Sequence, residues 1–144
     1  MKRQLSAAAV ALVGAATLTV SAAVAAVAPG TYKGHLYAGS TKIAGSPATV
    51  AVAGTKITIT VPKFPVKCLA PTGAYTQPGA PQKYVWKGTL KGNKVSGNYI
   101  NPLGGTGEYF TAKGTFTPAT KSFAGTLSFT GQCRGTSTVK AKKA

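Results

Sequence analysis

The stretch SFAGTLSFTGQC, residues 122–133, decides the fold class of this chain. Every second residue from Phe123 onward is apolar or glycine, and the residues between them are small or polar. Alternation with a period of two is typical of a β-strand that buries one face. We therefore predict one strand here, with an inner face made of Phe123, Gly125, Leu127, Phe129, Gly131 and Cys133.

The same alternation recurs along the chain, bounded by glycine, proline and asparagine. No segment after residue 28 shows a convincing 3.6-residue period. Short antiparallel strands with tight connections are typical of sandwiches and closed barrels. We therefore expect an all-β fold, an antiparallel β-sandwich or an up-and-down β-barrel of about eight strands. The other seven predicted strands cover residues 30–38, 47–55, 55–61, 83–91, 94–100, 108–117 and 136–141.

Interruptions between these strands predict one bulge and two loops. After Pro62 the phase slips, so that Phe64, Val66 and Cys68 share a face, as an edge bulge would produce. The segments 69–82 and 101–107 are rich in glycine, the first also in proline, and are expected to be loops. Loops on a β scaffold often carry binding residues, although many are only connectors.

A short motif places glycine in mid-strand four times: KGHL at 33–36, KGTL at 87–90, KGTF at 113–116 and AGTL at 124–127. Glycine weakens a strand unless the sheet must curve or another backbone must come close. Its recurrence on the predicted inner face therefore favours a coiled sheet that closes on itself. The alternative is that glycine-rich β sequences repeat such fragments by chance.

The N-terminus has the pattern of a secretory signal peptide. Lys2 and Arg3 precede a run of small and apolar residues, and the run offers A-x-A cleavage sites ending at Ala25 and Ala28. Cleavage after Ala28 would place Pro29 next to the cut, so we predict a signal peptide at 1–25 and a single secreted all-β domain at 26–144. The alternative is a retained N-terminal membrane anchor, since the run is about long enough to span a bilayer.

Two cysteines, Cys68 and Cys133, remain in this exported domain. Cysteines in an oxidising compartment most often pair. We predict a Cys68–Cys133 disulfide, which is worth about 4 kcal/mol in the chain-entropy description.

Lysine dominates the charge after residue 25. Fourteen lysines and Arg134 face a single acid, Glu108, and the chain has no aspartate. Such an excess favours anionic partners, so the first partners to test are anionic cell-envelope polymers or a membrane surface. Base-specific reading of nucleic acid relies on the arginine fork, so no specific nucleic-acid partner is expected. We expect a monomer.

Three lysines occupy the same place in the glycine motif. Lys33, Lys87 and Lys113 each precede the glycine and lie on the outer face. If their strands are neighbours, these lysines form a row that can bind an anionic surface. The alternative is that they keep the sheet soluble and prevent edge-to-edge aggregation.

The sequence offers little for catalysis. One acid cannot supply a pair of carboxylates, and a Ser-His-Asp triad is impossible without aspartate. Metal and cofactor motifs are absent too, so we predict a protein that is not an enzyme, with no metal and no cofactor. A secreted enzyme would require His35 and Glu108 to meet in one cleft.

A second functional hypothesis is a small β-barrel that carries an apolar ligand. About eight strands leave room for one small ligand in some barrels. A wide cavity lined by Tyr32, Tyr84, Trp86 and Phe110 would favour it, and a filled core would exclude it.

Three features resemble a group of small exported β-sheet proteins of actinobacterial type. They are the paired hairpin KGTFTPATKSFAGTLSF at 113–129, the ending GQCRGTSTVKAKK at 131–143, and the earlier Cys68. The chain departs from the group at Arg134, where an acidic residue is common, and at Val139 and Lys140, where a tryptophan-containing end is common. The resemblance implies export and a disulfide-bonded β domain, and it supplies no catalytic residues.

Overall fold

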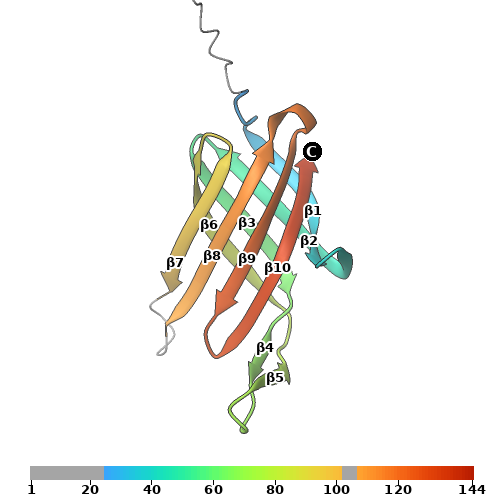
Figure 1. Ribbon diagram of the computed structural model, residues 1–144, viewed down its shortest axis with the longest axis vertical. Helices are drawn as coiled ribbons and strands as arrows, with labels where there is room; N and C mark the ends of the chain where they lie inside the picture. Colours follow the sequence, from blue (N-terminus) through green and yellow to red (C-terminus); the bar gives the residue numbers. More distant parts are fainter. Residues whose placement is uncertain (1–24, 102–106) are drawn as a thin grey trace, which may run out of the picture.

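The computed structural model describes residues 25–101 and 107–144, and it confirms the all-β prediction (Figure 1). Within this part of the chain there are ten strands and no α-helix; one 3₁₀ turn covers Pro118–Thr120. The strands are β1 (Gly30–Ala38), β2 (Thr41–Ala53), β3 (Lys56–Phe64), β4 (Lys67–Leu69), β5 (Tyr75–Pro78), β6 (Gln82–Lys91), β7 (Lys94–Asn101), β8 (Glu108–Thr117), β9 (Ser122–Thr130) and β10 (Cys133–Lys143).

Eight of these strands close into an antiparallel barrel. The order is β1-β2-β3-β6-β7-β8-β9-β10, and β10 pairs back onto β1, which closes the ring. Of the two expected architectures, the structure therefore shows the barrel. The extra strands β4 and β5 form a hairpin that projects beyond one end of the barrel and pairs with the start of β10 (Figure 1).

The stretch 122–133 contains one strand and the beginning of the next. Phe123, Leu127 and Phe129 are buried as predicted. The strand ends at Thr130, however, and Cys133 is the first residue of β10, so the prediction of one strand to Cys133 is wrong at its end. The chain turns at Gly131, whose N–H donates to the Cys133 carbonyl at 2.9 Å. The alternation of inner and outer residues continues in phase through this turn, so the sequence pattern gave no sign of the turn.

Aromatic side chains fill the interior. Trp86 is 1% exposed, and its indole Nε1 donates to the carbonyl of Ser128, 3.0 Å away, which ties β6 to β9 across the barrel. Around it, rings of Phe64, Tyr84 and Phe110 lie 4.8–6.0 Å from the Trp86 ring, centroid to centroid. These closely packed rings form a core of side chains inside the barrel. The indole N–H of Trp86, which is buried with them, has a hydrogen-bond acceptor.

The glycines of the repeated motif lie close against the neighbouring strands of the wall. Gly114 and Gly125 pair directly across β8 and β9. A Cβ on Gly34 would lie 1.9 Å from the carbonyl oxygen of Lys140 on β10, far inside van der Waals contact. Only glycine permits this approach, which supports the interpretation that the motif serves closure of the sheet.

The predicted bulge is present in the structure, whereas the first predicted loop is partly a strand. The pairing of β3 with β6 shifts between Val61 and Phe64, so the predicted bulge is confirmed. The segment 69–82 is not entirely a loop, because β5 pairs with β4 within it. Of the second predicted loop, residues 102–106 lie outside the described residues.

The disulfide between Cys68 and Cys133 is confirmed. It joins the paired residues of β4 and β10 and so fastens the hairpin to the barrel. A disulfide of this kind is typical of an oxidising, extracellular compartment. The predicted signal peptide lies, except for its last residue, outside the described residues.

Candidate functional site: a lysine-rimmed trough

The outer face of β7, β8, β9, β10 and β1 carries a strip of small residues between two groups of lysines. Strand pairing aligns one row across it, in the order Lys94, Thr115, Ala124, Lys140, His35. Strands lie about 4.8 Å apart, so Lys94 and Lys140 begin about 14 Å from each other with only Thr115 and Ala124 between them. We call this surface the lysine trough.

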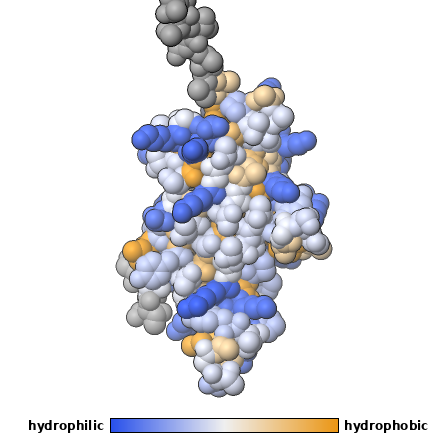
Figure 2. All heavy atoms as spheres, viewed as in Figure 1, coloured by the Kyte–Doolittle hydropathy of each residue, from blue (hydrophilic) through white to orange (hydrophobic). Residues whose placement is uncertain are grey.

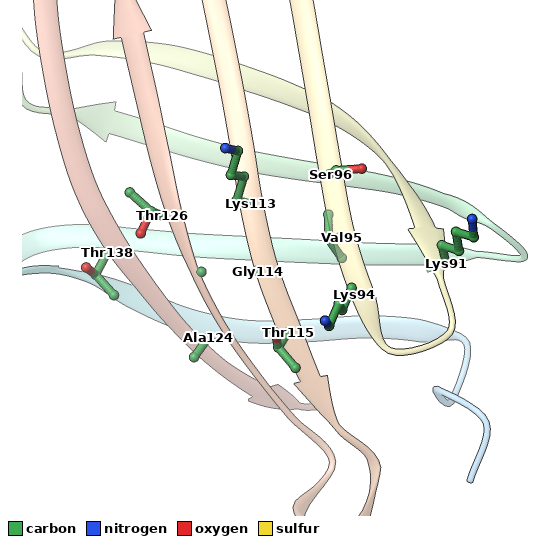
Figure 3. Close-up of a pocket in the computed structure, with 11 residues that line it drawn as sticks. Lys91, Lys94, Val95, Ser96, Lys113, Gly114, Thr115, Ala124, Thr126 and Thr138 are labelled. Carbon is green, nitrogen blue, oxygen red and sulfur yellow. The ribbon is translucent and has the colours of Figure 1, made fainter. Parts of the chain in front are cut away.

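The first margin of the trough lies over β7, β8 and the end of β6. Lys91, Lys94 and Lys113 line an open groove of about 890 Å³, floored by Thr115, Ala124 and other small side chains (Figure 3). The floor is low because β-branched threonine and alanine stand only a short way above the sheet, whereas each lysine extends over four methylene groups. The groove is therefore a shallow surface bordered by long cationic side chains.

The second margin lies over β10 and β1. Lys33 and Lys142 pair directly across these strands. Together with Lys140 they line a second depression, and Ala124 lines both depressions, so the two adjoin at this residue. In Figure 2, strongly hydrophilic side chains project on both sides of a paler central strip of this face.

The three lysines predicted as a row are divided between two places. Lys87 and Lys113 line one groove across β7, where the Lys87 ammonium also lies 5.7 Å from the centre of the Tyr99 ring. Lys33 stands on β1, which is not a neighbour of β6 or β8, so it joins the second margin instead. The structure thus brings two of the three together and places the third across the trough.

Sequence reasoning did not select Lys91, Lys94, Lys140 and Lys142. These residues lie outside the glycine motif on which the prediction was based. Lys91 and Lys94 flank the Gly92-Asn93 turn and pair with each other, as the residues on either side of a two-residue hairpin turn do. Lys140 lies opposite Ala124 because of the register of β9 with β10. The sequence prediction ended the first of these strands at Cys133 instead of Thr130, so it did not give this register.

The charge of the trough is uniformly positive. The only acid of the chain, Glu108, begins β8, seven residues from Thr115. At about 3.4 Å per residue it lies roughly 24 Å along the strand from the row that contains His35. His35 and Glu108 are also three strands apart, so the convergence that an enzyme would have required is not seen.

The residues predicted to line an apolar cavity belong to the core. Tyr84, Trp86 and Phe110 contact one another, and Tyr84 and Phe110 also contact Phe129; the ring centroids of Tyr84 and Phe129 are 4.5 Å apart. Tyr32 packs elsewhere, against Phe116, and its hydroxyl donates to the carbonyl of Ala28 at 2.9 Å. The contacts among these rings occupy the space that an internal ligand would need.

Comparison with known protein families, with curated proteins and with solved structures gives no match to this chain. Over residues 25–101 and 107–144, no group of three or more histidine, cysteine, aspartate or glutamate side chains could hold a metal ion. The same part of the chain contains no helix with the length and apolar character needed to cross a membrane.

Proposed function

We propose that this protein is a non-enzymatic, secreted binding module whose lysine trough holds an anionic polymer of the cell envelope. The observation that carries the proposal is the arrangement of two lysine margins on either side of a floor of small side chains. A linear polyanion lying on that floor reaches ammonium groups on both sides. Small floor residues let the polymer backbone approach without displacing a bulky side chain.

The charges suit a repetitive anionic partner better than a single shaped ligand. Lysine ammonium groups are flexible point charges, which attract carboxylate, phosphate or sulfate without fixing one geometry. A positive face of this kind raises the association rate with polyanions and makes binding sensitive to salt. If the lysines serve solubility alone, the trough lysines should contribute no more to polyanion affinity than lysines elsewhere on the surface.

The hypothesis of an internal apolar ligand has less support. The aromatic residues that would have lined its cavity contact one another inside the barrel. A ligand could enter only by pushing these rings apart, which would lose their packing. We therefore place function on the outer surface.

Two variants of equal net charge test the proposal. The first is the triple variant K94Q/K113Q/K140Q in the trough, and the second is K56Q/K63Q/K83Q, on the opposite wall formed by β3 and β6. Affinity for heparin and for poly-L-glutamate is measured across a range of salt. Each lost contact lowers the slope of log affinity against log salt by about one, so the trough variant should lose roughly three and the control little. Equal losses in the two variants would refute a site in the trough.

A further inference from the structure

The barrel wall has a gap between β1 and β4. Pairing of β10 with β1 reaches Thr138 opposite Tyr37, and its pairing with β4 covers only Cys133 and Arg134. Between these points, residues 135–137 of β10 pair with β9 on one side and, among the described residues, have no strand pairing on the other. An unpaired strand edge offers backbone donors and acceptors to whatever lies beside it.

This gap opens into a pocket of about 540 Å³. Its walls are mainly apolar: Ile43 comes from β2, Pro65 and Val66 from the connection between β3 and β4, and Pro78 from β5. The size lies in the range of pockets that hold small molecules, and apolar walls with a few polar groups are typical of them. The pocket is separate from the lysine trough and shares no lining residue with it.

Two cations stand at this pocket, Arg134 and Lys67, which pair across β10 and β4. The Arg134 guanidinium carbon lies 3.9 Å from the centre of the Tyr75 ring, and the Tyr75 hydroxyl donates to the carbonyl of Gly131 at 3.2 Å. This stacking holds the only arginine of the chain after residue 25 in a defined place. None of the described residues that line the pocket is acidic, so neither cation is neutralised by a carboxylate there.

We propose that this pocket binds a small single-chain amphiphile with an anionic head group, such as a fatty acid. The apolar chain lies against Ile43 and Val66, and the head group accepts hydrogen bonds from the Arg134 guanidinium, with Lys67 beside it. Arginine suits this task because its planar fork matches a carboxylate or phosphate with two parallel hydrogen bonds. The head group determines orientation, and the apolar wall supplies affinity.

The test uses the disulfide-bonded protein and dodecanoate below its micelle concentration, followed by calorimetry and by amide shifts in NMR. We expect saturable binding with shifts centred on residues 134–137. R134Q should weaken it at least tenfold, the loss typical of one charged hydrogen bond, while K113Q in the trough should leave it unchanged. A38W places a large side chain at the pocket lining without removing a cation, and it should also abolish binding.

Two comparison ligands and one vesicle experiment complete the test. Dodecyl maltoside and dodecyltrimethylammonium carry the same chain without the anion, and they should bind far more weakly. Equal binding of dodecyl maltoside, or an unchanged affinity in R134Q, would overturn the proposal. Phosphatidylglycerol vesicles distinguish the source of the ligand: displacement of dodecanoate by them indicates a membrane lipid, and its absence indicates a free amphiphile.

Discussion

Substitution of Gly34 by alanine is expected to be the most damaging single-methyl change in the barrel wall. A Cβ at this position would lie 1.9 Å from the Lys140 carbonyl oxygen and 2.6 Å from the Cα of Ala141. Both atoms belong to the backbone of β10, so no side-chain rotation relieves the contact, and β1 must move away from the strand that closes the barrel.

The size of the effect follows from this geometry. Overpacking typically costs 1–3 kcal/mol, and a clash with backbone lies at or above the upper end, so we expect about 3 kcal/mol or more. Gly88 is the matched control, because its added Cβ would meet the Ser96 carbonyl oxygen at 3.2 Å, a contact that a shift of a few tenths of an ångström relieves. Alanine there also restricts the unfolded chain, and G88A should remain within about 1 kcal/mol of the parent protein.

Urea unfolding followed by tryptophan fluorescence measures both variants. Trp86 is the only tryptophan of the chain and is 1% exposed, so its emission reports the loss of the core. With a slope of about 1.5 kcal/mol per molar urea, a loss of 3 kcal/mol moves the midpoint down by about 2 M. Equal midpoints for G34A and G88A would refute the argument that close strand approach selects glycine at residue 34.

Two further predictions concern the hairpin and the partly buried phenol of Tyr84. Replacing Cys68 and Cys133 together by serine should cost about 2–4 kcal/mol, because the bridge closes a separation of 65 residues, and hydrogen exchange should accelerate most in residues 67–78. Exchange that accelerates equally throughout the barrel would contradict a local role for the bridge. Burial, and then the charge of Glu108, raise the pKa of Tyr84 above its ordinary value of 10.0. The folded state binds this proton more tightly than the unfolded state does, so the protonated phenol of Tyr84 stabilises the fold. This contribution is complete below pH 10 and is lost as the pH rises through the raised pKa of Tyr84. Burial raises the pKa of Tyr32 as well, so absorbance titration at 295 nm should show two late phenols in the parent protein and one in Y84F; an unchanged curve in Y84F would contradict the prediction.

The sequence was sufficient for most of the barrel strands because burial alternates along most of their length. The buried residues Phe123, Leu127 and Phe129 of β9 were predicted individually, and the phase slip near Pro62 marked a real bulge. The choice between sandwich and barrel depended on whether β1 pairs with β10, strands about 100 residues apart. Alternation within a strand contains no information on that pairing.

The trough was harder to predict than the fold. Its margins combine lysines from five strands, and their alignment depends on register at each strand pair. A shift of one residue would turn Lys140 inward and Ala141 outward. Lys33, Lys87 and Lys113 occupy the same place in a repeated motif, each before a mid-strand glycine. The same place in a motif does not mean that two residues are close in space, and Lys33 lies on a strand that neighbours neither of the other two.

Lysine footprinting tests directly whether a polyanion binds in the lysine trough. The protein is acetylated briefly with and without a saturating linear polyanion, and the modification of each lysine is read by mass spectrometry. Because the fourteen lysines after residue 25 react in one sample, each is a control for the others. We predict protection of the six that border the trough, which are Lys33, Lys91, Lys94, Lys113, Lys140 and Lys142, with Lys56, Lys63 and Lys83 unprotected. Uniform protection over both walls, or protection confined to the opposite wall, would contradict the account.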